Sequence, residues 1–437
     1  MLYVENMREI DAATWDRLVR ESPGGGHALQ TYAWGEFKRT QGWRPLRLAL
    51  RDDADGHRVL GTGQLLIRAM PGTGGAIAYC VKGPWVDWSS GEQARAMLGG
   101  MEHFARRHGA YLLKVESELL AGPAAPTAVP PNVDASIKRT LAAVRRLRHA
   151  NGNGHAAADP AQDGAGDKNG GDKGGSDKGG PDKRVVEARA ALQAVRDAGE
   201  RDGLSPGRAA FAELGFVKSL WDQQFRTTMV IDLDRSPDEM LARMHSKWRY
   251  NVKLARRKGV TIEQDDSVAG MERLYDMDLR TAQRNGFMLR PKEYFFGAWR
   301  AMIEAGYAHI FFAYHEGRPL AALLAYTFGH KVWYTVGASE TEGRNVMPAH
   351  ALQFHIMEWA RERGIDYYDL VAIPNLENIG PDDPLWDIYV FKSGFGGRPV
   401  EWAGAMDKIL DPRGRAWEAL EPAYYRLYKW RTRDVPY

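Results

Sequence analysis

Four short segments of this 437-residue chain place basic side chains beside aromatic ones. The segments are residues 32–43, 81–88, 245–259 and 390–397. Their chemically capable side chains are those of Trp34, Lys38, Lys82, Asp87, Lys247, Arg249, Tyr250, Phe391 and Lys392. Lysine and arginine beside rings suit a site for an anionic group, arginine as a bidentate contact and lysine as a point charge. For any one segment the alternative is an aromatic core with solvated basic residues, but four such segments in one chain favour a binding site.

Composition limits the chemistry that these residues can do. The single cysteine, Cys80, permits no intrachain disulfide and favours a reducing compartment. No cluster of histidine and cysteine has the spacing of a metal site, so we expect neither metal nor thiol chemistry. The N-terminus lacks a signal-peptide pattern, and no apolar run approaches the ~18 residues that span a bilayer. The sequence therefore predicts a soluble, cytoplasmic protein.

The order of predicted elements repeats along the chain. A helix, a glycine and an apolar strand follow one another at residues 104–115 and again at 359–370, and a Gly-Phe pair closes each copy at 215–216 and 394–395. This recurrence predicts a duplicated domain, and two packed copies create a cleft where ligands usually bind.

Each copy is predicted as an α/β domain of the N-acetyltransferase (GNAT) type. In the first copy we expect a helix over 11–21, strands over 45–52, 61–70 and 76–80, a helix over 91–108 and a strand over 110–116. In the second we expect a strand over 228–233, helices over 236–258, 271–285 and 292–305, strands over 308–315, 321–328 and 331–338, a helix over 348–363 and a strand over 367–371. The predicted domains are 1–120, completed by 209–227 and by the C-terminal tail, and 228–437.

Residues 121–208 interrupt the first copy and read as an insertion. An Asp-Lys pair recurs every five residues within 150–184, a low-complexity stretch with too little to bury to fold. Helical patterns at 136–147 and 185–195 flank it and could pair as an antiparallel arm. The insertion is therefore predicted as a helix, a disordered loop and a second helix.

The second copy lacks the loop that binds coenzyme A in acetyltransferases. That loop needs glycines, so that backbone amides can reach the pyrophosphate at a helix N-terminus. Here residues 344–349 place Met347 at the glycine position, and Pro348 removes an amide donor. An acyl-CoA donor is therefore not expected.

The ordered segments resemble the Fem-type (FemA/FemB/FemX-like) peptidoglycan-bridge aminoacyltransferases. The resemblance rests on residues 34–38 with 42–43, 82–87, 214–216, 247–259, 336–339 and 391–397, and it covers nearly the whole chain except 121–208. It implies two acetyltransferase-like domains that transfer an amino acid from aminoacyl-tRNA to the side-chain amine of the third residue of the peptidoglycan stem peptide. It implies no cofactor beyond aminoacyl-tRNA as co-substrate. The implied partners are that tRNA, the acceptor (lipid II or UDP-MurNAc-pentapeptide) and, peripherally, the inner face of the membrane.

The resemblance also suggests roles for the candidate residues. Lys38 and Arg249, with Lys247, are expected on the acceptor diphosphate; Tyr250 and Tyr334 would hydrogen-bond the peptide or sugar, and Trp34, Lys82 and Phe391 complete the substrate-binding set. Lys392 is expected to stabilise the developing oxyanion or the terminal phosphate of the tRNA, and Asp87 or Asp369 to act as base. Because the ester is already activated, alignment alone could suffice.

The chain departs from the family pattern at one place, and two alternative functions remain open. Some family members carry a coiled-coil arm in the second domain, whereas the insertion here lies in the first, so a role for the arm is not carried over. The first rival is a CoA-dependent N-acyltransferase acting on a small amine or a polysaccharide precursor. The second is a non-catalytic protein that binds RNA or a cell-wall precursor.

Overall fold

The computed structural model describes residues 1–55, 58–121, 185–187, 189–191, 193–194, 197, 205–375, 379–432 and 434. The chain separates into two units, Met1–Pro123 with Arg184–Tyr437, and Ala124–Lys183. The second unit lies outside the described residues, and so do the predicted helix over 136–147 and the low-complexity segment 150–184. The described positions within 185–194 are helical, as the sequence predicts for that stretch.

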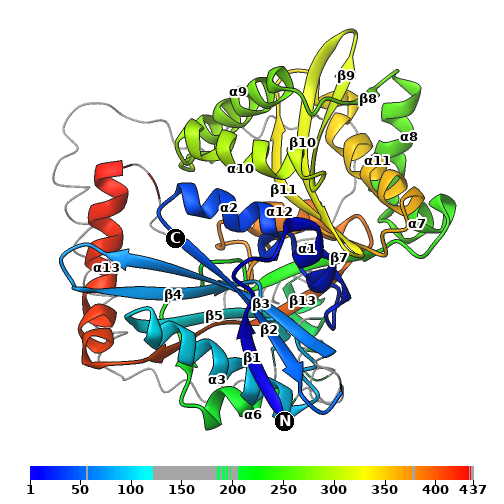
Figure 1. Cartoon of the computed structure of the whole chain (residues 1–437). Coiled ribbons are helices and arrows are strands. Elements are labelled where there is room, and N and C mark those ends of the chain that lie inside the picture. Colours follow the sequence, from blue (N-terminus) through cyan, green and yellow to red (C-terminus); the bar gives the residue numbers. More distant parts are fainter. Residues whose placement is uncertain are drawn as a thin grey trace. The chain divides into compact units, whose positions relative to one another are not determined.

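The N-terminal elements build six strands and the helices around them (Figure 1). In chain order they are β1 (Leu2–Asn6), α1 (Ala12–Glu21), the 3-10 helix η1 (Ala28–Gln30), α2 (Tyr32–Thr40), β2 (Arg44–Asp52), β3 (Arg58–Met70), β4 (Gly75–Val81), α3 (Gly91–Arg107), β5 (Ala110–Leu120), α6 (Ser205–Glu213) and β6 (Val217–Lys218). We call β1–β5 the first half-sheet.

The C-terminal elements build a second group of strands and two terminal elements. They are β7 (Thr227–Asp232), α7 (Pro237–Arg243), α8 (Ser246–Arg257), β8 (Thr261–Gln264), α9 (Val268–Asn285), α10 (Lys292–Glu304), β9 (Ala308–His315), β10 (Arg318–Phe328), β11 (Lys331–Ser339), η2 (Arg344–Val346), α11 (Pro348–Glu362), β12 (Tyr367–Asp369), α12 (Trp386–Ser393), β13 (Arg398–Ile409) and α13 (Pro412–Thr432). We call β7–β12 the second half-sheet.

The two half-sheets share one pairing pattern. Strands β1 to β4 pair antiparallel in sequence and β4 pairs parallel with β5; β8 to β11 pair antiparallel in sequence and β11 pairs parallel with β12. α3 connects the first parallel pair and α11 the second. Each of these helices is followed by a left-handed glycine, Gly109 (φ 72°) or Gly364 (φ 70°). The predicted duplication of a GNAT-type α/β arrangement is therefore confirmed.

A single strand, β13, joins the two half-sheets. Its residues Arg398–Glu401 pair with β7, and residues from Trp402 to Ile409 pair with β5. The register is irregular between Trp402 and Gly404, where the strand passes from one partner to the other. Gly404 has a φ of 74°, and a Cβ there would clash with Lys218 Nζ and Asp222 Oδ1. Glycine is therefore the residue that this crossing point requires.

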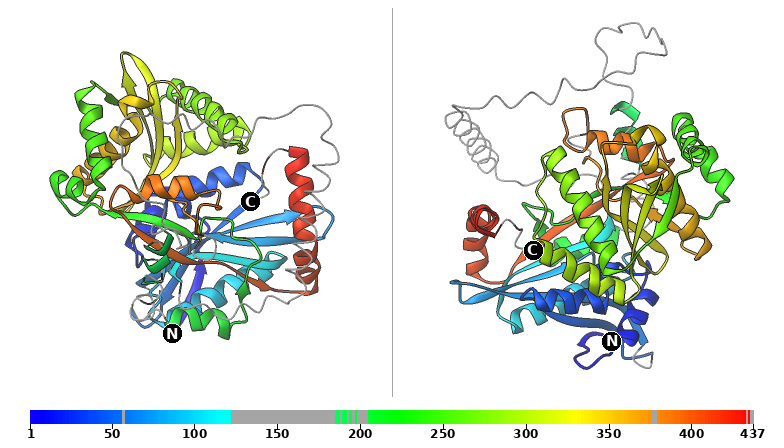
Figure 2. Two further views of the ribbon diagram at one scale, coloured as in Figure 1. Left: turned by 180° about the vertical axis from the view of Figure 1, so that it is seen from behind. Right: turned by 90° about the horizontal axis from the view of Figure 1, so that it is seen from above.

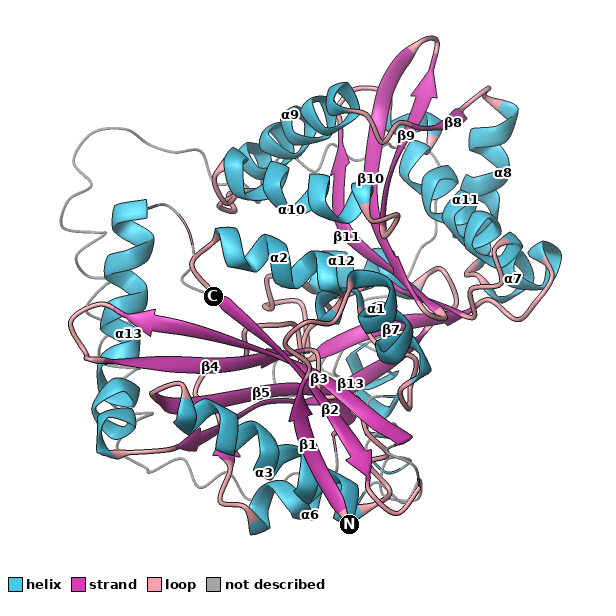
Figure 3. Cartoon of the chain, viewed as in Figure 1, coloured by secondary structure: helices cyan, strands magenta, loops and turns pink. Residues whose placement is uncertain are grey.

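Helices cover both faces of each half-sheet because neighbouring strand residues point to opposite sides. Leu65 and Ile67 of β3 pack in one core with Met101 of α3, whereas Leu66 packs in another with Trp417 of α13. In the second half-sheet the strands β9–β11 lie between α9 and α10 on one side and α8 and α11 on the other (Figure 3). Figure 2 shows the same layers from behind and from above.

The predicted single helix over 236–258 is wrong. The structure has two helices, α7 and α8, separated at Met244 and His245, whose ψ angles of 152° and 142° are extended. The sequence shows only a continuous apolar pattern there, but Arg249 Nη1 donates to the carbonyls of Ala242 (2.7 Å) and Met244 (2.8 Å) and so satisfies the end of α7. β1, β8, α12, β13 and α13 were not predicted as elements. α6 starts at Ser205, before the predicted end of the insertion, and packs against α3.

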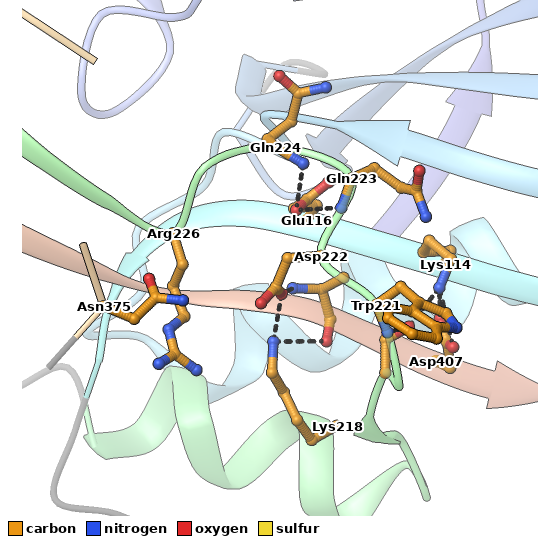
Figure 4. A network of polar contacts seen from close by, with 12 residues as sticks. Lys114, Glu116, Lys218, Trp221, Asp222, Gln223, Gln224, Arg226, Asn375 and Asp407 are labelled. Carbon is orange, nitrogen blue, oxygen red and sulfur yellow. Dashed lines mark hydrogen bonds and ion pairs between the residues drawn. The ribbon is translucent and has the colours of Figure 1, made fainter. Parts of the chain in front are cut away.

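A buried ion pair holds β13 against the first half-sheet (Figure 4). Lys114 of β5 is 1% exposed, and its Nζ lies 2.7 Å and 2.9 Å from the two carboxylate oxygens of Asp407 on β13. The same ammonium donates to Ser219 Oγ in the segment that leads to β7. Nearby, Glu116 accepts hydrogen bonds from the backbone amides of Gln223 (3.1 Å) and Gln224 (2.9 Å). The connecting segment is thus fixed to β5 and β13 by buried polar contacts.

Replacing Lys114 with methionine should destabilise the protein by about 3–5 kcal/mol, because it leaves the buried Asp407 carboxylate without its counterion. Urea unfolding of the variant and the wild type measures the loss. The double variant Lys114→Met with Asp407→Leu should recover most of it, since no lone charge remains buried. As a control, Arg17→Met removes an exposed helical ion pair with Glu21 and should cost no more than about 0.5 kcal/mol. A small loss in Lys114→Met would contradict the assigned role of the pair.

Candidate functional site

Lys38 lies in an aromatic box where α2 meets α10. The ring of Phe37 on α2 packs edge-on against Tyr294 of α10, with ring centroids 5.1 Å apart. Lys38 Nζ lies 5.8 Å, 5.4 Å and 5.6 Å from the ring centroids of Trp34, Trp43 and Tyr294. The predicted pair of Lys38 and Trp34 is therefore brought together, and rings from two helices and the following turn surround the ammonium.

The ammonium of Lys38 has no acidic partner among the described residues. Lys38 is 5% exposed and makes no hydrogen bond or ion pair with them. Burial lowers the pKa of Lys38 to about 7, and the positive charges of Arg290 and Arg68 lower it further, against a weaker opposing effect of Asp434. Cation–π contacts stabilise such a group only in part. A buried cation flanked by two arginines is a site that an anion would stabilise.

A second charged cluster lies between the two half-sheets, and Lys82 is the one of its members that the sequence analysis singled out. Glu118 near the end of β5 lies 2.9 Å from Lys331 Nζ of β11, 3.7 Å from His27 Nε2 and 3.9 Å from Lys82 Nζ. Burial alone would raise the pKa of Glu118, but Lys331, His27 and Lys82 hold it at about 2. Burial lowers the pKa of His27 to about 3, so His27 is neutral at neutral pH and the two lysines supply the charge. Lys82 is thus paired inside the protein.

Lys392 holds the turn that follows β12. Its Nζ donates to the carbonyls of Val371 and Ala372, at 2.9 Å each, and lies 5.7 Å from the ring centroid of Tyr334. Val371 and Ala372 have positive φ values of 56° and 23°, so the lysine fixes a strained stretch of backbone. Burial lowers the pKa of Lys392 to about 7, while Asp369 acts to raise it. These two hydrogen bonds use two of the three ammonium hydrogens, and the third has no acceptor among the described residues.

Asp369 supports the same turn from the other side. Its carboxylate accepts from the backbone amide of Val371 at 2.7 Å and from Thr228 Oγ1 on β7. Burial raises the pKa of Asp369, and the charge of Glu118 raises it further. The carboxylate therefore interacts electrostatically with both Glu118 and Lys392.

Phe391 links α12 to α8. Its ring lies 5.1 Å from that of Phe395 and 5.4 Å from that of His350, both edge-on, and its carbonyl accepts from Trp248 Nε1 at 2.9 Å. A Cβ at Gly394 would clash with the Trp248 indole, so the close approach of the two helices requires this glycine.

The predicted residues on α8 are only partly available to a ligand. Lys247 and Tyr250 are exposed, and Tyr250 is 56% exposed beneath the guanidinium of Arg257, which lies 5.7 Å from its ring centroid. Arg249 donates from Nη1 to backbone carbonyls at the end of α7. Its other two nitrogens make no hydrogen bond with the described residues and could contact a ligand. No contact among the described residues joins Arg249 to Lys38, so their shared role at one diphosphate stays a prediction.

Asp87 lies in the turn before α3. Its Oδ1 accepts from the backbone amide of Ser89 at 3.0 Å and from Ser89 Oγ at 2.6 Å. The neighbouring Trp88 stacks on Phe211 of α6. Within the described part of the chain no contact connects Asp87 with Lys392, so the structure gives Asp87 a local turn-forming role and leaves its role as a base a prediction.

Asp278 is a buried carboxylate that the sequence analysis did not single out. It is 4% exposed, lies on the buried side of α9 with Leu274 and Thr281, and forms no hydrogen bond or ion pair with the described residues. Thr281 Oγ1 accepts from the amide of Ser339, which fixes this side of α9 against β11, the strand that carries Tyr334. Burial raises the pKa of Asp278 to about 6. The pKa of Tyr334 rises to about 12 through burial and through the charge of Asp278. The sequence did contain a signal for this residue, because Asp278 occupies a position of the helical pattern where an apolar side chain is expected.

The start of α11 has the local structure expected from its sequence. η2 ends at Val346, Met347 adopts a left-handed φ of 57°, and Pro348 is the first residue of the helix, which has no side-chain cap. Pro348 cannot offer a backbone N–H at this helix end. The expectation of a donor other than coenzyme A stays a prediction.

Two protein-family models match separate parts of this chain. Residues 10–124 match the model of the FemAB family, and residues 242–381 match that of the acetyltransferase (GNAT) domain. A crystal structure of FemX superposes with a TM-score of 0.70 at 21% identity, over 95% of this chain and 100% of that chain. The Fem-type resemblance is confirmed. The fold is α/β, with two GNAT-type halves.

Two curated relatives extend the Fem-type comparison. The UDP-N-acetylmuramoylpentapeptide-lysine N(6)-alanyltransferase of Weissella viridescens is 34% identical over 192 residues, which are 43% of this chain and 55% of that enzyme. The lipid II:glycine glycyltransferase of Staphylococcus aureus is 22% identical over 93% of this chain and 94% of its own length. The match to the Weissella enzyme thus spans only about half of that enzyme. Among the described residues, no helix is both long and apolar enough to cross a membrane.

Replacing Asp278 with asparagine should stabilise the protein at about pH 8 and change little at about pH 4. A carboxyl whose pKa is raised from 3.8 to about 6 binds its proton more readily in the folded than in the unfolded state. Its contribution to stability therefore falls as the pH rises between these values and stays low above them. The full penalty is about 3 kcal/mol, from roughly two pKa units. Urea unfolding across this pH range measures it.

The control is Asp276→Asn, which removes an exposed carboxylate from the same helix and should leave the pH dependence unchanged. If Asp278 contacts a substrate, the Asp278→Asn variant should lose transfer activity while it gains stability. Such a trade-off between stability and activity is common at functional sites. An Asp278→Asn protein no more stable than the wild type at alkaline pH would show that the carboxylate is stabilised by a partner.

Proposed function

We propose that this protein transfers an amino acid from aminoacyl-tRNA to the side-chain amine of the third residue of a peptidoglycan stem peptide, in the cytoplasm. The acceptor would be lipid II or UDP-MurNAc-pentapeptide. The names of the two relatives support this class of reaction, one as an alanyltransferase of a UDP-linked pentapeptide and one as a glycyltransferase of lipid II. The observation that carries the proposal is the buried ammonium of Lys38, which lacks an acidic partner among the described residues and is flanked by the charges of Arg68 and Arg290.

Both proposed acceptors carry a diphosphate, which is the anion that the Lys38 site suits. The diphosphate would lie against Lys38 and restore its charge, because a neighbouring anion favours the protonated ammonium. Aromatic rings around the ammonium exclude water and strengthen the contact. Binding would therefore take up a proton above about pH 7, where free Lys38 is largely neutral.

The chemical step is attack of the amine on the ester carbonyl, with transient negative charge on the carbonyl oxygen. The C–N bond of the amide forms and the C–O bond to the terminal ribose of the tRNA breaks; the amine loses a proton and the departing ribose oxygen takes one up. The N–H of Lys392 that the carbonyls of Val371 and Ala372 leave free would donate to that oxygen or to the terminal phosphate of the tRNA. Asp278, whose pKa of about 6 keeps it a carboxylate at neutral pH, is a candidate acceptor for the amine proton or a counterion for an ammonium. Tyr334 lies near both residues.

A transfer assay separates this function from its two rivals. Purified protein is incubated with UDP-MurNAc-pentapeptide and radiolabelled aminoacyl-tRNA, or with acetyl-CoA instead, and the products are resolved by mass spectrometry. We expect amide formation with the tRNA donor, and its loss when the tRNA is first digested with ribonuclease. Transfer from the CoA donor would favour an N-acyltransferase, and binding of the precursor without transfer from either donor would favour a non-catalytic protein. Either result would overturn the proposal.

Replacing Lys38 with methionine should weaken binding of UDP-MurNAc-pentapeptide by about 1.5–3 kcal/mol, the usual value of a charge-assisted contact. The wild type should also bind less tightly as the pH rises through about 7, because the ammonium must be protonated to hold the anion, and the variant should lose this dependence. Calorimetric titration at several pH values measures both effects. An acceptor analogue without the diphosphate is the control. Equal losses with both acceptors would remove Lys38 from a phosphate site.

A further inference from the structure

The C-terminal helix α13 exposes an apolar stripe. Leu420, Leu427 and Trp430 are 59%, 60% and 81% exposed, and together with Ala423 they recur at spacings of three and four. Side chains with this spacing lie on one face of a helix. Three large apolar side chains exposed in one row are unusual on a soluble surface and mark an interaction site.

The side of α13 that adjoins this stripe is fixed to the first half-sheet. Trp417 is 5% exposed and packs against Tyr111 of β5, with ring centroids 6.0 Å apart, and against Tyr424 of its own helix at 5.0 Å. Figures 1 and 2 show α13 at the margin of this half-sheet. The helix therefore presents its outer face in a defined orientation.

The basic and the acidic residues of α13 differ in their exposure to solvent. Arg415, Arg426, Lys429 and Arg431 are exposed. The two acidic residues of the helix are less exposed to solvent: Glu418 is half-buried and Glu421 is 2% exposed. The outward face thus combines leucine, tryptophan and basic residues without an acid. This is the composition of a helix that lies in the interface of an anionic membrane.

The helix also adjoins the Lys38 site. The guanidinium of Arg68 lies 5.5 Å from the ring centroid of Trp43, which is part of the aromatic box, and 6.0 Å from that of Tyr428 on α13. Arg290, next to Lys38, pairs with Asp434 just beyond the helix at 3.1 Å. A surface that received α13 would therefore lie close to the anion site.

We propose that the outer face of α13, formed by Leu420, Ala423, Leu427 and Trp430 with the flanking basic residues, docks this protein on an anionic membrane. The reason for such docking rests on the proposed function. Docking would bring the Lys38 site near the headgroup layer, where the diphosphate of a lipid-linked acceptor lies. An RNA ligand fits less well, because leucine side chains offer nothing to phosphates or base edges. The membrane explains both the apolar stripe and the basic flanks.

The test is flotation of the full-length protein with vesicles that contain no acceptor. We expect binding to vesicles of phosphatidylglycerol and phosphatidylcholine, weaker binding at high salt, and little binding to phosphatidylcholine alone. The double variant Leu427→Ser with Trp430→Ser should bind at least about tenfold more weakly, since two side chains that enter the interface are lost. Trp221→Ser is the matched control, because Trp221 is 44% exposed on a different segment and should not contribute.

Transfer to the soluble UDP-linked acceptor separates this proposal from the proposed function. The α13 variant should keep that activity, which also shows that it is folded, and should lose activity on lipid II in vesicles. Three results would overturn membrane docking: no flotation of the wild type, flotation that the α13 variant retains, or self-association that the variant abolishes, which would assign the face to a second copy. Loss of tRNA binding in the variant, without loss of flotation, would assign the face to RNA.

Discussion

The pairing of β13 with both β5 and β7 is the constraint on which the remaining arrangement depends. A strand has two hydrogen-bonding edges, and β13 gives one of them to each half-sheet over successive residues. The half-sheets consequently share a continuous backbone hydrogen-bond network instead of meeting only through side chains. Polar contacts then fix this network: Lys114 of β5 pairs with Asp407 of β13, and Glu118 near the end of β5 pairs with Lys331 of β11. Relative motion of the two halves would expose these buried charges, which is costly.

The buried charges fall into paired and unpaired classes, and the two classes differ in what they can do. Lys114, Lys82 and Lys331 each have a carboxylate partner inside the protein. Lys38 and Asp278 have none among the described residues, and their pKa values of about 7 and about 6 both show the cost of burial. A fold selected for stability alone would pair or expose such groups. Their retention is understandable if a substrate supplies the missing partner, an anion for Lys38 and a cation or a proton for Asp278.

Periodicity was sufficient for most elements, because the helix–glycine–strand pattern at Gly109 and Gly364 is a local signal. It failed where distant residues decide the structure. The break between α7 and α8 depends on a side chain, Arg249, that returns to the preceding turn. β13 could not be recognised as the shared strand, because its partners lie far away in the sequence. The aromatic surroundings of Lys38 were partly predictable from Trp34 and Trp43, but Tyr294 comes from α10, and Glu118 becomes a site residue only through the approach of β11.

The candidate groups lie on different elements of the fold. Lys38 belongs to the contact of α2 with α10, whereas Lys392 and Tyr334 lie on α12 and β11, and no contact among the described residues joins the two groups. In the proposed function one acceptor would contact both groups, since its diphosphate and the amine of its third residue are separated by a sugar and two amino acids. Placement of that amine would then depend on how firmly the two groups are held relative to each other, and the shared strand β13 with its buried ion pair would help to hold them. On this reasoning the rigid connection between the halves contributes to catalysis through alignment, which an activated ester requires more than it requires a strong base.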